Sequence, residues 1–201
     1  FRHDRPLIDP STGEPFRRLV RVEVPGSPTI GGVWITIDPE DARDRDDAVW
    51  AGPSPDIEGG HIVWVAIADV AQAVFPGSAL DREARNRGNS TYFPDRVVPM
   101  LPDRLSGDLC SLHEGVDRAV LAVRMHFDAT GARVGHGFHR GIIRSRASLS
   151  YVQAQAAEDG ADHGLGDEQA GIVRDLFAAY RAAAKARDAR GPLELDLPER
   201  R

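Results

Sequence analysis

Residues 38–47 contain five aspartates, and this crowding constrains the chain more than any other feature of its sequence. Four of them are singled out here, namely Asp38, Asp44, Asp46 and Asp47. Carboxylates held this close repel one another unless a hard cation neutralises them, and Mg²⁺ and Mn²⁺ prefer oxygen ligands of this kind. Apolar runs at 33–37 and 48–50 flank the stretch, so we expect the acids to lie on a turn between two buried strands. Residues 38–47 are called the acidic turn below.

The acidic turn has other interpretations that its residues test. As a solvated surface loop it would pair its acids with Arg43 and Arg45, in ion pairs of small energetic value. A calcium loop of the EF-hand type starting at Asp44 needs glycine sixth and glutamate twelfth, where this chain has Val49 and Pro55. An aspartyl-phosphatase motif fails because alanine stands where threonine or valine is required. A hydrolytic site with one or two cations and a structural acidic turn remain.

Several blocks after the acidic turn carry a resemblance to a known family. They are residues 63–70 (VWVAIADV), 75–94 (FPGSALDREARNRGNSTYFP), 98–102 (VPMLP), 105–106 (LS) and 109–112 (LCSL). In this order and spacing, behind TIDPEDARDRDD, they resemble the RNB catalytic domain of the ribonuclease II and ribonuclease R family. The resemblance covers roughly residues 33–151 and continues more weakly to 198.

The resemblance implies hydrolysis of single-stranded RNA from its 3′ end to nucleoside 5′-monophosphates, with Mg²⁺ as cofactor and Mn²⁺ as the alternative. It makes the four aspartates the catalytic and metal-binding residues, with Asp46 orienting or activating the attacking water. It also makes Tyr92 the aromatic that packs against a terminal base. Arg85 and Arg87 are candidate phosphate contacts from their position alone. The alternatives are a non-catalytic RNA-binding module that retains the acidic turn and a metal-stabilised structural domain.

The domain of this family is about twice as long as the matching part of this chain. The resemblance also implies the domain boundaries. We expect a lead-in segment at 1–32 and the N-terminal portion of an RNB-type domain at 33–201, with the remaining half beyond Arg201. The 41% hydrophobic residues suffice for a core, and no apolar stretch approaches the length of a membrane span. A single cysteine, Cys110, fits a reducing cytoplasm and a buried apolar role.

The net charge of −6 argues against a simple non-specific nucleic-acid binder. Arginine nevertheless gathers in residues 82–104 and 132–146, a distribution that suits a channel admitting a phosphate backbone. Asp69 stands inside an apolar strand, where an unpaired carboxylate is costly. We therefore expect it to make a structural bond to backbone or to an arginine.

Hydrophobic periodicity predicts an α+β fold: a mixed, largely antiparallel sheet packed with helices. The predicted strands are 17–24, 33–37, 46–50 and 61–70, the last buried on both faces, with a hairpin of 119–127 and 133–143. The predicted helices are 81–87, 150–157 and 168–190, and residues 88–112 are expected to form a loop. In the last helix we expect one apolar face made of Ile172, Val173, Leu176, Phe177 and Tyr180.

Overall fold

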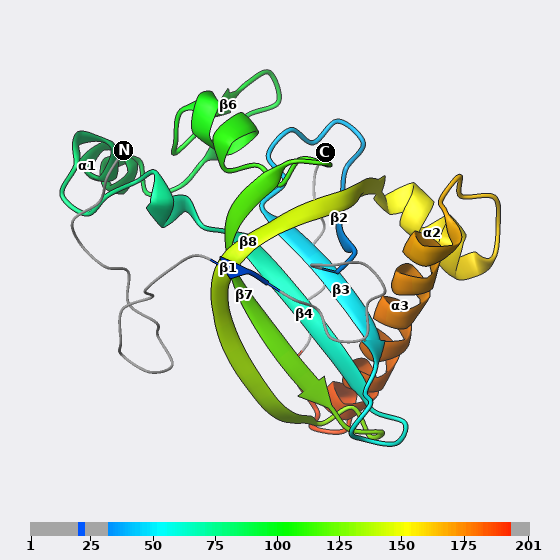
Figure 1. Ribbon diagram of the computed structural model, residues 1–201. Coiled ribbons are helices and arrows are strands. Elements are labelled where there is room, and N and C mark those ends of the chain that lie inside the picture. The colour runs from blue at the N-terminus through cyan, green and yellow to red at the C-terminus, as the bar shows by residue number, and fades with distance from the viewer. Residues whose placement is uncertain (1–19, 23–31, 194–201) are drawn as a thin grey trace.

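A computed structural model describes residues 20–22 and 32–193 of the chain (Figure 1). Its main element is a six-stranded sheet with the order β1-β8-β2-β3-β4-β7. The strands are β1 (Val20–Arg21), β2 (Trp34–Asp38), β3 (Asp47–Pro53), β4 (His61–Ala68), β7 (Asp117–Phe127) and β8 (Arg133–Ser150). Most neighbours are antiparallel, and only β1 and β2 lie parallel to β8. The predicted α+β class with a largely antiparallel sheet is confirmed.

The 18-residue strand β8 closes the sheet on itself. Its first part pairs antiparallel with β7, from Arg133 to Arg144, and its last part pairs parallel with β2, up to Ser150 opposite Asp38. Because β2, β3, β4 and β7 are already linked in series, this double pairing makes a closed circuit of five strands. Figure 1 shows β8 curving from the β7 hairpin across to α2. Closure removes most unpaired sheet edges.

Large aromatic and small residues alternate on the inner face of this barrel. Trp34 and Trp64 meet edge to face, with their ring centroids 6.1 Å apart. Ala48, Trp50 and Ala66 lie on the same inner face and are buried. This alternation follows from the period of two in a strand, because residues i and i+2 share a face. The inner face is therefore a packed core.

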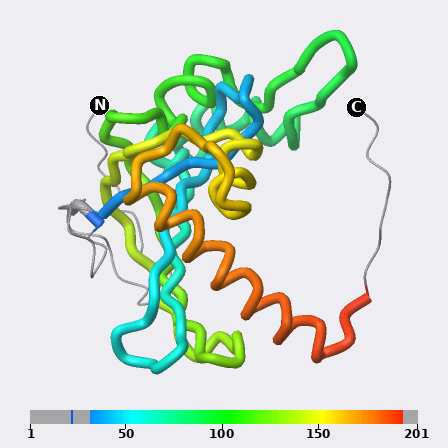
Figure 2. Tube along the Cα trace, turned by 90° about the vertical axis from the view of Figure 1, so that its right-hand side faces the viewer, coloured from blue at the N-terminus to red at the C-terminus, as the bar shows by residue number. Residues whose placement is uncertain are grey.

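Helix α3 (Asp167–Asp188) covers the outer face of β3 and, in part, β4 (Figure 2). Ile172 and Val173 are buried in this contact, and Leu176 and Phe177 pack against it, as predicted. Tyr180 is 61% exposed, so its assignment to the apolar face was wrong. Ala179 is buried in its place. No helix in the described ranges is long and apolar enough to cross a membrane.

The remaining elements lie around one end of the barrel. They are η1 (Val70–Gln72), α1 (Ala79–Arg87), β5 (Thr91–Tyr92), β6 (Val97–Val98), η2 (Leu105–Leu109, a π-helical turn) and α2 (Tyr151–Asp159). Residues 88–112, called the excursion below, lie at the barrel end opposite the β7–β8 turn (Figure 2). They were expected to be a loop, and they contain the small β5–β6 hairpin and η2.

Most predicted elements agree with the structure, with boundary shifts of a few residues. The strand predicted at 61–70 ends at Ala68, and Ile67 in it is 47% exposed, so burial on both faces was wrong at this end. The hairpin is longer than predicted. Of the predicted lead-in at 1–32, which includes the strand predicted at 17–24, only residues 20–22 and 32 are among the described residues. Residues 194–201 also lie outside the described residues.

Candidate active site

The acidic turn connects β2 to β3 at the end of the barrel. Asp38 is the last residue of β2 and pairs with Ser150, the residue that caps the N-terminus of α2. Asp47 is the first residue of β3 and pairs with Ile67 near the end of β4. The two outer aspartates are therefore placed by regular strand pairing. This confirms the prediction that the acids lie on a turn between two strands.

Hydrogen bonds and an ion pair hold the middle of the acidic turn. The carbonyl oxygen of Asp46 accepts a hydrogen bond of 2.8 Å from the amide of Ala68. The Arg45 guanidinium donates to the Ala42 carbonyl at 2.5 Å and lies 3.8 Å from the Asp38 carboxylate. Arg45 and Asp38 are both largely buried, so this arginine partly offsets the negative charge on one side of the turn.

Burial raises the pKa of three carboxyls of the acidic turn above the ordinary value. For Asp46, loss of hydration raises the pKa first, and the charges of Asp44 and Asp47 raise it further. For Asp38, loss of hydration and then the charge of Asp47 raise the pKa, while Arg45 opposes the shift. Loss of hydration alone raises the pKa of Asp47. The carboxylates thus lie close enough to repel one another.

The chemistry of these donors fits a hard divalent cation. All four side chains offer carboxylate oxygens, and the buried Oδ2 atom of Asp38 accepts no hydrogen bond. Within 20–22 and 32–193, however, no three acidic, histidine or cysteine side chains converge into a ready-made ligand set. The structure therefore brings the four aspartates into electrostatic contact without closing them around one point. To bind one cation together, these carboxylate side chains would have to rotate toward one another against their mutual repulsion.

A cavity of about 240 Å³ lies between the acidic turn and the excursion. Its walls include Asp44 and Asp46 from the acidic turn, and Tyr92 and Cys110 from the excursion. A second hollow of about 500 Å³ is also lined by Asp44 and Tyr92. Tyr92 is 70% exposed, so its ring is accessible from solvent. The structure thus brings together two predicted carboxylates and the predicted stacking aromatic, which are separated by more than forty residues in sequence.

Comparison with known proteins gives this arrangement a family. Residues 30–201 match the RNB domain family. The chain belongs to the RNB domain family. It is 39% identical to ribonuclease R of Escherichia coli (strain K12) over 206 aligned positions, which cover 98% of this chain and 25% of that protein. This RNB chain therefore spans about a quarter of the length of that relative.

Solved structures with the same fold include ribonuclease R of Mycoplasma genitalium. Its complex with double-stranded RNA has a TM-score of 0.76 and 30% identity, covering 82% of this chain and 29% of that one. Its complex with ribose-methylated single-stranded RNA has a TM-score of 0.68 and 32% identity, covering 79% and 24%. The predicted resemblance is confirmed at the level of family and fold.

Two predicted RNA contacts of this RNB chain, Arg85 and Arg87, do not line either hollow. Arg85 pairs with Asp81 on α1, with its Nε atom 3.2 Å from the carboxylate. Arg87 pairs with Glu83 at 2.8 Å and also donates to the Pro99 carbonyl at 2.8 Å. The structure does not bring either arginine to the acidic turn.

Two other predictions concern buried polar groups near the cavity. Asp69 directly follows Ala68 in a cavity wall and pairs with Arg140 of β8, with Nε and Oδ2 2.5 Å apart. The expected bond to an arginine is confirmed. Cys110 is buried as predicted, and burial raises the pKa of its thiol. Its position in the cavity wall was not foreseen.

Sequence reasoning also missed Ser111, which contacts the acidic turn directly. The Ser111 side chain is fully buried and bonds to the backbone of the turn from 66 residues away in sequence. The position of this serine within the apolar run 109–112 is the one sequence signal that could have indicated a buried hydroxyl in need of a hydrogen-bond partner. No local pattern identified the partner.

Proposed function

We propose that this RNB domain chain forms part of a 3′→5′ exoribonuclease that hydrolyses single-stranded RNA to nucleoside 5′-monophosphates. The observation that carries the proposal is the shared cavity, which is lined by Asp44, Asp46 and Tyr92. Carboxylates for phosphodiester chemistry and an aromatic ring for base stacking thus line one cavity. The domain is proposed to occupy 33–201, and the rest of the catalytic domain to follow Arg201. A cytoplasmic location stays a prediction.

The acidic turn would hold the cation. Asp38, Asp44 and Asp47 are its proposed ligands, and Mg²⁺ or Mn²⁺ bound there would neutralise charge on the scissile phosphate and lower the pKa of a bound water. Asp46 orients the attacking water and accepts its proton on a carboxylate oxygen. Burial and neighbouring charge raise the pKa of Asp46, which favours this role because a stronger base accepts a proton more readily.

Tyr92 would position the RNA end. Its exposed ring, in the same cavity as Asp44 and Asp46, can stack on an unpaired base, an interaction of about 1–3 kcal/mol that tolerates any base. Phosphate binding by Arg85 and Arg87 also stays a proposal. Each would have to exchange its carboxylate partner, Asp81 or Glu83, for a phosphate oxygen.

The test uses a 5′-labelled single-stranded RNA, with and without Mg²⁺, incubated with the longest product of the gene and with the 201-residue chain. We expect stepwise shortening with release of 5′-monophosphates, dependent on Mg²⁺, from the long product. The Asp46→Asn variant keeps the shape of the side chain and removes its charge. It should abolish hydrolysis while RNA affinity changes little. Equal loss of binding and hydrolysis would contradict the role given to Asp46.

A non-catalytic RNA-binding module is the second candidate. It is favoured by the absence, within the described ranges, of three potential ligands converging on one point. Bound RNA without hydrolysis by either protein, at any Mg²⁺ or Mn²⁺ concentration, would support it. A chain that neither binds RNA nor cleaves it would leave the acidic turn with a structural role.

A further inference from the structure

Ser111 bonds to two backbone positions of the acidic turn. Its hydroxyl oxygen accepts a hydrogen bond of 3.0 Å from the amide of Arg45 and donates one of 2.9 Å to the carbonyl of Arg43. The next residue, Leu112, donates its amide to the carbonyl of Arg45 at 2.8 Å. Ser111 is fully buried, so water cannot replace these bonds. Three bonds thus hold two residues of the acidic turn against the excursion.

Ser111 is itself held by the barrel. Arg118 of β7 donates from Nε to the Ser111 carbonyl at 2.9 Å and from Nη2 to the Asp108 carbonyl at 3.0 Å. The Ser111 amide donates to the same Asp108 carbonyl at 3.1 Å. The hydroxyl therefore projects from a backbone that is bonded on both sides. A side chain anchored in this way can fix a partner's position as well as occupy space.

The bonded and the functional residues alternate along the acidic turn. Ser111 and Leu112 bind the backbone of Arg43 and Arg45, and the Arg45 guanidinium donates to the Ala42 carbonyl. The residues between and after them, Asp44 and Asp46, line the cavity. The bonds at Arg43 and Arg45 lie on either side of Asp44 and directly before Asp46, so they restrict the backbone torsions on which the direction of both carboxylates depends.

We propose that Ser111 is a positioning residue that orients Asp44 for binding a divalent cation and Asp46 for contact with the attacking water. The inference rests on the proposed function only in assuming that the acidic turn takes such a cation. Ser111 touches neither cation nor RNA, and it acts through the backbone of Arg43 and Arg45. Without its hydroxyl, mutual repulsion would turn the two carboxylates apart.

The test compares Ser111→Ala with Ser145→Ala. Ser145 is also buried, and its hydroxyl also donates to a backbone carbonyl, that of Ala147, so both variants lose a buried hydroxyl. Three measurements are made on the 201-residue chain: the melting temperature, hydrogen exchange at the Arg45 amide, and the affinity for Mn²⁺ by electron paramagnetic resonance. The Mg²⁺ concentration for half-maximal hydrolysis is measured separately on the long product.

We expect Ser111→Ala to accelerate exchange at Arg45 and to weaken Mn²⁺ binding about tenfold, the range in which groups that orient metal ligands act. Ser145→Ala should lower the melting temperature to a similar extent and leave the Mn²⁺ affinity unchanged. Ser111→Cys, with nearly the same volume and a weaker donor and acceptor, should show the same effects in smaller measure. It replaces the alanine variant if that one does not fold.

Unchanged Mn²⁺ affinity in a folded Ser111 variant would overturn the inference. So would equal loss of Mn²⁺ affinity in Ser145→Ala, because the effect would then reflect general destabilisation. If the wild-type long product does not hydrolyse RNA, the proposed function fails, and exchange and Mn²⁺ affinity still decide the role of Ser111. If the wild type binds no Mn²⁺, the inference fails whatever the exchange rates.

Discussion

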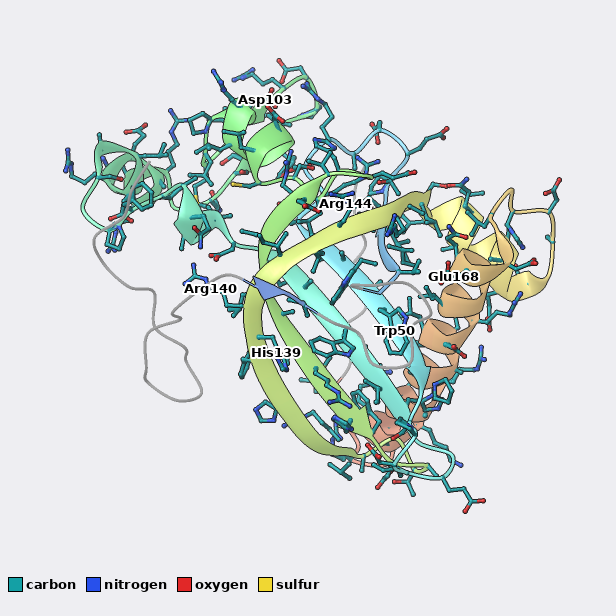
Figure 3. The ribbon with its side chains drawn as sticks, in the orientation of Figure 1. Trp50, Asp103, His139, Arg140, Arg144 and Glu168 are labelled. Atoms are coloured by element: carbon teal, nitrogen blue, oxygen red, sulfur yellow. The ribbon has the colours of Figure 1, made fainter. Side chains whose placement is uncertain are left out.

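Removing the charge of Asp69 should destabilise the fold more than any other single polar change near the site. Asp69 follows β4 and pairs with Arg140 of β8 (labelled in Figure 3), and both side chains are only 7% exposed. Gln72 donates a second hydrogen bond to the same carboxylate oxygen, at 3.2 Å. Asp69→Asn keeps the shape of the side chain and removes the carboxylate charge that pairs with the buried Arg140 guanidinium.

The expected magnitude follows from that burial. Breaking a buried ion pair by removing one partner costs about 3–5 kcal/mol, because the remaining charge is not rehydrated. In a protein of this size that corresponds to a fall of roughly 6–20 °C in melting temperature. Replacing both partners, as in Asp69→Leu/Arg140→Met, removes both charges of the pair. The double variant should therefore be more stable than Asp69→Asn.

Urea unfolding followed by tryptophan fluorescence measures these free energies, since Trp34, Trp50 and Trp64 are buried in the core. Asp117→Asn is the matched control. Its ion pair with Arg144 is also short, at 2.8 Å, but both side chains are at least 40% exposed, so its loss should cost far less than the loss of the buried pair. A similar small cost for Asp69→Asn, or a double variant less stable than the single one, would refute the reasoning.

Three further predictions test the site and its support. Burial raises the pKa of Asp47, so the stability linked to its protonated form is complete below the unfolded pKa and is lost as pH rises through the higher folded pKa. Asp47→Asn should therefore raise the melting temperature at pH 7 without cation and reduce the stabilisation by Mn²⁺. A lower melting temperature at pH 7 would contradict this. Tyr92→Ala should broaden the length distribution of the final products on a sequencing gel, with stability changed by less than about 0.5 kcal/mol because the side chain is exposed; an unchanged distribution would exclude stacking. Gly131 has φ = +81°, and a Cβ there would collide with the backbone of Ala182 in α3. At Gly164 φ is +64° and the space is open, so Gly164→Ala should cost only the backbone strain of about 1–3 kcal/mol. Gly131→Ala should therefore lower the free energy of unfolding in urea by more than Gly164→Ala does.

The fold was predictable wherever local pattern decides structure. Alternation and apolar runs located β2, β3, β4 and the β7–β8 hairpin, and the 3.6-residue period located α3. Tyr180 was misassigned because the buried stripe of α3 passes through Ala179 instead. Farther along α3, the turn at Gly131 approaches the helix backbone at Ala182. Closure by β8 was also missed, because nothing local to 133–150 shows that its two ends pair with different strands.

The site was predictable only in part, for a related physical reason. The acidic turn follows from two apolar runs and the carboxylates between them, all within 33–50. Its second wall comes from the excursion, whose contact with the turn depends on bonds between residues more than sixty positions apart. Ser111 shows the limit: one buried hydroxyl determines where two carboxylates point, and a single serine has no periodicity to reveal it.

The acidic turn combines low intrinsic stability with strong external support. Burial raises the pKa of Asp38, Asp46 and Asp47, and neighbouring charges raise the pKa of Asp38 and Asp46 further, so these three carboxylates oppose folding at neutral pH without cation. The bonds from Ser111, Leu112 and Ala68 hold the backbone in place against this repulsion. Binding of a divalent cation would relieve this repulsion between carboxylates, and that relief would contribute to the affinity for the cation. Binding strength at the turn therefore depends on the rigidity of the excursion that holds it, and substitutions in 105–112 should weaken cation binding even though none of those residues is a ligand.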